Sequence, residues 1–337
     1  YTDSSCPALL LEPQRTNLVD YSEYYDVWFK AGTTPTFTEN YGTSPEGLQN
    51  STRVQLDNNE LFYRTPNAAQ GAYVFSVFAK DISGGGSKIT LRIDAPATKV
   101  ATFDLSDGSI DTYTSDNALI EDYGNGWYRC MLIQNNDGIV NVVIAEGDAS
   151  LDCEIYGAQL EAGSYATSYI PTYGTSVTRS VEATEKTGIS DLIGQTEGTL
   201  FVEFEYNSVK DHYWAVATLM GSNTSELIEL YGGPNSNSLA FAMNDNSVNQ
   251  FIKNTPLSFG THKVAIAYAE NNTIAYIDGS PIGSVDTNCT IPTLTQLAIG
   301  KFSYSSSVFF SLGDGIKQSL LFKTRLSNEE LATLTTI

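Results

Sequence analysis

The stretch YVFSVFA, Tyr73 to Ala79, decides the fold class of this chain. Successive side chains of a β-strand point to opposite faces, so the odd-numbered positions share one face and the even-numbered positions share the other. Both faces are largely apolar, which is typical of a strand in the centre of a β-sandwich. We predict that this stretch is a buried strand of an all-β domain.

The same alternation recurs through the first half of the chain. Turns such as Ser106-Asp-Gly108 and Gly124-Asn-Gly126 separate the alternating runs. The runs are Lys88 to Ile93, Val100 to Leu105, Trp127 to Ile133, Val140 to Ala145 and Cys153 to Leu160. Short strands at this spacing predict a sandwich or jelly roll.

The stretch GAQLEAGSYATSYIPT, Gly157 to Thr172, interrupts this pattern. Pro171 lacks an N–H group and cannot continue a central strand. The small residues allow the backbone to lie close to a sheet, and Tyr165, Tyr169 and Ile170 are suited to dock into it. We therefore expect a non-helical segment that crosses the edge of the sandwich and has a structural role.

A second β pattern begins at GTLFVEFEY, Gly198 to Tyr206, in which Leu200, Val202, Phe204 and Tyr206 share a face. Near the end of the chain, Ser327 and Glu330 have the spacing of a capping box that opens a short helix.

The polar, mixed-charge segment between the two patterns predicts an interdomain linker. We expect a jelly-roll β-sandwich at 1–182, a linker at 183–196 and a second sandwich at 197–337.

The charge balance excludes two classes of partner. The chain has 39 acidic and 18 basic residues, a formal net charge of -21. Such a surface repels nucleic-acid phosphates and anionic lipid headgroups. No run of apolar residues reaches the 18 or so that a membrane-spanning helix needs. Neither nucleic acid nor a membrane is an expected partner.

The residue types that hold cofactors are sparse. The four cysteines lack CxxC spacing and there are two histidines, so no zinc or redox centre is indicated, and the cysteines are expected to be free thiols. No cofactor is predicted, although a structural Ca²⁺ could bind acidic turns. The turns that could hold it contain Asp57, Glu60, Asp104, Asp107 and Asn244 to Asn246, and turn formation explains these residues equally well.

Seven short motifs occur in order within the first 180 residues. They are LLLEPQRTNL (Leu9 to Leu18), YSEYYDVWFKAG (Tyr21 to Gly32), SPEG (Ser44 to Gly47), FSVFAK (Phe75 to Lys80), GNGWYRC (Gly124 to Cys130), GAQLEAGSYATSYIPT (Gly157 to Thr172) and SVTRS (Ser176 to Ser180). Through these motifs the region resembles a module of tailed-bacteriophage head-spike and tail-fibre proteins. The resemblance implies a jelly roll like those of carbohydrate-binding modules, in a protein of the virion.

The remainder of the chain contains a second set of motifs. They are EGTLFVEFEY (Glu197 to Tyr206), THKVAIAYAENNTIAYIDGSPIG (Thr261 to Gly283), LAIGKF (Leu297 to Phe302) and the closing IKQSLLFKTRLSNEELATL. With these motifs the region looks like a concanavalin A-like, laminin-G-type sandwich. The resemblance suggests binding of glycans or protein surfaces.

The sequence offers little support for a catalytic site. Concanavalin A-like glycosidases carry a Glu-x-Asp-x-x-Glu strand motif, which this sequence lacks. Glu203 and Glu205 share a strand face and could form a carboxylate pair, but a solvated strand face explains them as well. His212 has no nucleophile motif with it. We predict a protein without enzymatic activity.

Aromatic residues at loop edges are better candidates, because glycan recognition needs ring faces for sugar C–H groups and a few polar partners for hydroxyls. We take Tyr213, Trp214, Tyr231 and Tyr304 as ligand-binding candidates. The alternative for each is packing inside its own domain. Trp28 and Trp127 are expected in the core.

These observations favour a non-enzymatic virion protein, a head fibre, spike or tail fibre. Its expected place is the extracellular virion surface, and its expected partners are cell-surface or environmental glycans and other virion proteins. The phage resemblance implies a homotrimer, in which weak sites would add through multivalency. Two alternatives remain: a bacterial polysaccharide-active enzyme or its accessory binding module, and a capsid decoration protein without a ligand.

Overall fold

The structure, a computed structural model, describes residues 9–337 except 11, 33–34, 67, 83, 85–86, 137, 148–149, 183, 211–212 and 301–314. The chain forms two compact units. The first unit is Arg15–Arg179. The second unit is Ser180–Ile337 together with the described residues up to Gln14.

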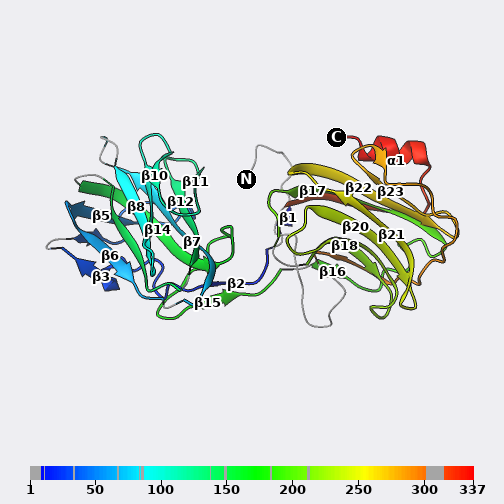
Figure 1. Ribbon diagram of the computed structural model, residues 1–337, viewed down its shortest axis with the longest axis horizontal. Coiled ribbons are helices and arrows are strands. Elements are labelled where there is room, and N and C mark those ends of the chain that lie inside the picture. The colour runs from blue at the N-terminus through cyan, green and yellow to red at the C-terminus, as the bar shows by residue number, and fades with distance from the viewer. Residues whose placement is uncertain are drawn as a thin grey trace. The chain divides into compact units, whose positions relative to one another are not determined.

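The first unit is a sandwich of two six-stranded antiparallel sheets (Figure 1). The β8 sheet has the order β10 (Ser109–Tyr113), β9 (Lys99–Asp104), β8 (Lys88–Asp94), β13 (Asn141–Glu146), β6 (Leu61–Arg64) and β3 (Phe29–Ala31). The β7 sheet has the order β11 (Asn117–Asp122), β12 (Tyr128–Asn136), β7 (Gly71–Asp81), β14 (Ser150–Ala162), β5 (Thr52–Asp57) and β4 (Thr36–Thr38). A short 3-10 helix (Tyr25–Val27) and the pair β2 (Arg15–Asn17) and β15 (Val177–Arg179) complete the unit.

The stretch Tyr73 to Ala79 forms the middle of β7. Its odd-numbered side chains lie in the core between the sheets, and Val74 and Phe78 lie in smaller clusters on the outer face. Trp28 and Trp127 are both buried, as expected. Cys130, Cys153 and Cys289 are buried free thiols, whereas Cys6 lies outside the described residues.

The segment after β14 crosses the outer face of the β7 sheet and not the sandwich edge that the sequence predicts. Ala166 packs against Val74 and Met131, and Tyr169 packs against Phe78 and Tyr156. Its expected docked, non-helical character is confirmed. We call residues 163–176 the crossing segment.

Polar side chains beneath the crossing segment hold it in place. The Glu161 carboxylate, fully buried, accepts hydrogen bonds from the Thr167 N–H (2.8 Å) and the Thr167 hydroxyl (2.7 Å). The Gln159 side-chain oxygen accepts one from the Ile170 N–H (2.7 Å). The Asn17 amide donates to the carbonyls of Ala158 (3.1 Å) and Ile170 (2.9 Å).

The second unit is also a sandwich of two six-stranded antiparallel sheets. The β17 sheet has the order β1 (Leu9–Leu10), β26 (Gly315–Phe322), β17 (Glu197–Tyr206), β22 (Gly260–Ala269), β23 (Ile274–Ile277) and β24 (Ser280–Pro281). The β18 sheet has the order β16 (Thr184–Lys186), β25 (Gln296–Ile299), β18 (Trp214–Met220), β19 (Leu227–Gly232), β20 (Ser238–Asp245) and β21 (Val248–Pro256). The predicted inward face of β17, Leu200 to Tyr206, lies in the core between them.

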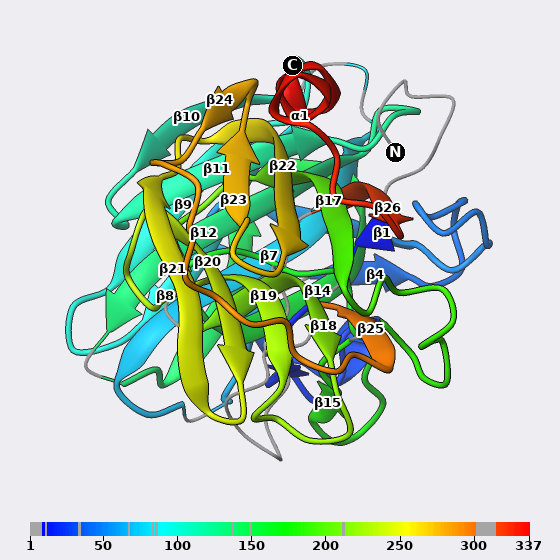
Figure 2. The ribbon, with the colours of Figure 1, turned by 90° about the vertical axis from the view of Figure 1, so that its right-hand side faces the viewer.

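Helix α1 (Asn328–Thr335) covers the outer face of the β17 sheet at β22 and β23 (Figure 2). Leu331 packs there against Phe201, Ile274 and Tyr276. The predicted capping box is present: the Ser327 hydroxyl accepts from the Glu330 N–H, and the Glu330 carboxylate accepts from the Ser327 N–H. In the described part of the chain, no helix is long and apolar enough to cross a membrane. The fold class, all-β with two sandwiches and one short terminal helix, is confirmed.

The bounds of the two units differ from the predicted domains 1–182, 183–196 and 197–337. Leu9 and Leu10 form β1 and pair with Ile316 and Gly315 of β26, at the edge of the second unit. Thr184 to Lys186, inside the predicted linker, form β16 and pair with β25. Both segments join the second unit through backbone hydrogen bonds. They are only two and three residues long, so no alternation in their sequences predicts a strand.

Candidate functional site

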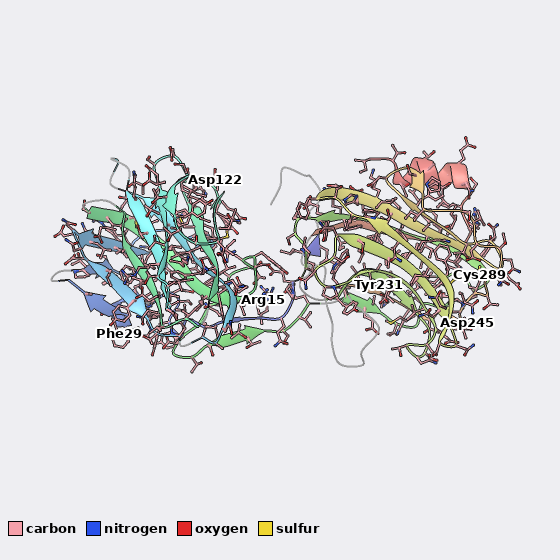
Figure 3. All side chains as sticks on the ribbon, in the orientation of Figure 1. Arg15, Phe29, Asp122, Tyr231, Asp245 and Cys289 are labelled. Atoms are coloured by element: carbon pink, nitrogen blue, oxygen red, sulfur yellow. The ribbon has the colours of Figure 1, made fainter. Side chains whose placement is uncertain are left out.

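The four aromatic residues proposed from the sequence do not form one site. Trp214 is fully buried in the core and stacks on Tyr206, with ring centroids 5.5 Å apart, so its ring is not offered to a ligand. Tyr213 is 46% exposed, and Tyr231 lies partly buried on β19 (Figure 3). Tyr304 lies outside the described residues. Ligand binding by Tyr213 and Tyr231 stays a prediction.

The structure describes two of the three residues considered for catalysis, Glu203 and Glu205. Glu203 and Glu205 lie on the outer face of β17, and Glu205 forms an ion pair with Lys317 (2.9 Å). Their strand neighbours on β22 are Lys263 and Thr261. This is the solvated strand face considered above. His212 lies outside the described residues.

Exposed aromatic side chains gather instead on the first unit. Tyr173 is 72% exposed and its ring meets those of Tyr24 (centroids 4.8 Å apart) and Tyr21 (5.8 Å) edge to face. Phe29, 54% exposed on the edge strand β3, lies 5.4 Å from the ring of Tyr63 on β6. Figure 3 shows Phe29 at the lower left of this unit. We call Tyr21, Tyr24, Phe29, Tyr63 and Tyr173 the aromatic platform.

Arg64, at the end of β6, joins the two halves of the platform. Its guanidinium lies 5.3 Å from the ring centre of Tyr21 and 5.7 Å from that of Phe29. Two of its nitrogens bond the Asp20 carboxylate, one through an Nε–Oδ1 contact of 2.8 Å, and Nη1 donates to the Val27 carbonyl (3.0 Å). Because these bonds fix the planar guanidinium, the rings of Tyr21 and Phe29 each contact a group of fixed position.

A row of polar side chains continues from Tyr63 across the outer face of the β8 sheet. In the strand register, Tyr63 pairs with Val143, and Val143 pairs with Arg92. Arg92 binds Asp94 on the same strand face through Nε (2.9 Å) and Nη2 (3.2 Å).

The row extends from Asp94 to the end of β6. Asp94 accepts a hydrogen bond from the Asn141 amide (3.3 Å), and the Asn141 side-chain oxygen accepts one from the Thr65 hydroxyl (2.9 Å). We call Thr65, Arg92, Asp94 and Asn141 the polar row.

A second network connects the platform to the crossing segment. The Tyr169 hydroxyl donates to the Glu23 carboxylate (2.9 Å) and lies 2.5 Å from the Ser22 hydroxyl. Burial raises the pKa of Glu23, the charge of nearby Glu46 raises it further, and the hydrogen bond from Tyr169 opposes both. Since Glu23 lies between Tyr21 and Tyr24, this network fixes the backbone that carries half of the platform.

The turns proposed for calcium are explained in part by local hydrogen bonds. Asp104 accepts from the N–H of Ser106 (2.9 Å), and Asp107 accepts from the N–H of Ser109 (3.0 Å), which is the pattern of Asx turns. Among the described residues, no three His, Cys, Asp or Glu side chains are grouped to hold a metal ion. Structural calcium stays a prediction.

The platform and the polar row together offer two kinds of contact. Exposed ring faces attract the C–H groups of a sugar, whereas guanidinium, carboxylate, amide and hydroxyl groups pair with its hydroxyls. The sequence did not indicate this site, because its parts lie far apart in the chain and come together only in the folded unit. The parts are residues 20–29, 63–65, 92–94, 141 and 173. The signal that could have indicated it is the density of aromatic residues in YSEYYDVWF, Tyr21 to Phe29.

Comparisons with known proteins show only distant likenesses. No protein-family model and no curated protein matches the sequence. The CBM40 of the Ruminococcus gnavus IT-sialidase is 14% identical with a TM-score of 0.38, covering 46% of this chain and 97% of that one. Domains LG4-5 of the mouse laminin alpha1 chain are 12% identical with a TM-score of 0.30, covering 86% of this chain and 90% of that one. A Trypanosoma rangeli sialidase is 12% identical with a TM-score of 0.34, covering 89% of this chain and 62% of that one.

Proposed function

We propose that this protein is a non-enzymatic glycan-binding protein and that the aromatic platform with its polar row is the binding face. The observation that carries the proposal is the exposure of two rings: Phe29, which lies beside the fixed guanidinium of Arg64, and Tyr173, which packs edge to face on Tyr24. Large apolar side chains are seldom left exposed in such a group unless they bind something. The polar row adds the hydroxyl partners that a purely apolar docking surface would lack.

Glycan-array binding of the full chain tests this proposal. Phe29→Ala and Tyr173→Ala should each weaken binding about fivefold, since a stacked ring contributes on the order of 1 kcal/mol. Tyr113→Ala is the matched control, because Tyr113 is also exposed, at 51%, on β10 at the opposite edge of the same sheet. Undiminished binding by both platform variants would contradict the proposed face. Loss of binding in Tyr213→Ala alone would place the site on the second unit.

We further propose that the protein acts at the extracellular surface of a bacteriophage virion, as a fibre or spike subunit among other virion proteins. The support is the set of sequence words that resemble head-spike and tail-fibre modules. Mass spectrometry of particles from a phage whose genome encodes the chain should detect it. Its absence from the particles would favour the secreted accessory module.

The same resemblance supports a trimer. Light scattering of the purified 36.6 kDa chain should then give about three times that mass. A monomer at all concentrations would contradict this oligomeric state and leave the glycan site to be judged by the array.

A further inference from the structure

The cationic side chains on the four strands that carry the platform and the polar row have carboxylate partners. On strands β3, β6, β8 and β13, each lysine and arginine lies within ion-pair distance of an aspartate. The pairs are Lys30–Asp26 (2.6 Å), Arg64–Asp20, Lys88–Asp111 (3.4 Å) and Arg92–Asp94 (2.9 Å). The charge of each guanidinium or ammonium is therefore compensated before any ligand arrives.

This compensation decides which saccharides the face accepts. A carboxylate or sulfate that leaves water needs an uncompensated cation as a partner, and none is present on these strands. The formal charge of -21 over the whole chain adds long-range repulsion of anions. A neutral sugar meets neither obstacle.

The Arg92–Asp94 pair is suited to a neutral ligand. Arg92 Nη2 donates a hydrogen bond to Asp94, and Arg92 Nε lies in ion-pair contact with the same carboxylate. A guanidinium has five N–H donors, so further donors remain for a ligand. Asp94 supplies acceptor oxygens beside them. Two neighbouring hydroxyls of a sugar ring, one accepting from Arg92 and one donating to Asp94, match this arrangement.

We propose that the face selects neutral saccharides and rejects those that carry a carboxylate or sulfate, with the Arg92–Asp94 pair as the determinant. The inference rests on the proposed glycan-binding function and goes beyond it by naming the class of ligand and the residues that select it.

Paired glycans that share a core test the inference on the full chain, for example lactose against sialyllactose and a neutral oligosaccharide against its sulfated form. The neutral member should bind at least about tenfold more tightly, a difference near 1.4 kcal/mol. Its affinity should change little with NaCl, because no ion pair with the ligand forms.

Asp94→Asn is the decisive variant, because it keeps the shape of the side chain and leaves Arg92 uncompensated. Its preference for neutral over acidic glycans should fall about tenfold, and its binding of acidic glycans should weaken as salt rises. Asp152→Asn is the control: on the β7 sheet, Asp152 pairs with the same two nitrogens of Arg53, Nε (2.8 Å) and Nη2 (2.7 Å). This control should keep the preference of the unmodified chain.

The possible failures are distinguishable. Tighter binding of the acidic members by the unmodified chain overturns the selectivity and leaves the glycan-binding function standing. An unchanged preference in Asp94→Asn, with folding verified by circular dichroism, removes the Arg92–Asp94 pair as the determinant. Absence of binding to every glycan overturns both proposals.

Discussion

Each unit covers one outer sheet face with a later part of its own chain, but the two coverings differ in chemistry. In the second unit, α1 lies on β22 and β23 through apolar contacts centred on Leu331. In the first unit, the crossing segment lies on the β7 sheet through buried Asn17, Gln159 and Glu161 as well as through Ala166 and Tyr169.

The difference has a consequence for function. Apolar contact is not directional, so α1 can stabilise its sheet without fixing any atom closely. Hydrogen bonds are directional, and those of the first unit fix the path of the backbone from Ala162 to Tyr173. The same bonds that stabilise the first sandwich therefore place a ring of the proposed binding face.

Among the substitutions that test this comparison, removal of the Asn17 side chain should cause the largest loss of stability. Its fully buried amide donates to Ala158 and Ile170, and its oxygen accepts from the N–H groups of Val19 (3.1 Å) and Leu160 (3.2 Å). Asn17→Ala leaves four buried backbone groups without a partner and should destabilise the first unit by about 3 to 5 kcal/mol.

Hydrogen–deuterium exchange of the full chain measures this effect in each unit separately. In Asn17→Ala, protection should fall on β7 and β14 and stay unchanged on β17 and β22. Asn58→Ala, at an exposed turn position, is the control and should change neither. An equal loss of protection in the second unit would show that the covering is not local to the first.

Truncation of Leu331 should break the apolar covering. Leu331 is fully buried against Phe201, Ile274 and Tyr276, so Leu331→Ala should cost about 2 to 4 kcal/mol through lost burial and the cavity left behind. Exchange should increase in α1, β22 and β23 while the first unit and glycan binding stay unchanged. Leu192→Ala is the control, because Leu192 is 54% exposed. A loss of glycan binding in Leu331→Ala would contradict the division of roles between the units.

Features that depend on neighbours along the chain were predictable. The two faces of β7 and β17 follow from alternation, and the N-terminus of α1 follows from the Ser327–Glu330 spacing. Both are set by backbone geometry over a few residues, so the sequence contains the whole signal.

Features that depend on register between distant segments were not predictable. Alternation counted back from the buried Leu219 would place Trp214 on the outer face of β18. A bulge between Ala215 and Ala217 reverses the alternation and turns Trp214 into the core. The platform has the same origin, because strand pairing brings Phe29 to Tyr63, and a β-bridge from the crossing segment brings Tyr173 to Tyr21.

The smallest expected effect is a difference in how the stability of the two coverings depends on pH. Glu23 in the first unit has a raised pKa, so the folded state holds its proton more tightly, and this contribution to stability is lost as pH rises through the folded pKa. Glu330 in the second unit has a lowered pKa, because it accepts hydrogen bonds from Ser327, so its contribution is lost as pH falls through the folded pKa.

Glu23→Gln and Glu330→Gln remove the two titrations while keeping a side chain of the same shape, and Gln still serves in a capping box. Between about pH 3 and 7, the stability of the unmodified chain relative to Glu23→Gln should fall as pH rises, whereas its stability relative to Glu330→Gln should rise. Denaturant unfolding at several pH values measures both differences. Slopes of the same sign would mean that the buried carboxylate beside Tyr169 is stabilised by its hydrogen bonds more than it is penalised by burial, and the polar covering would then resemble the helix cap rather than contrast with it.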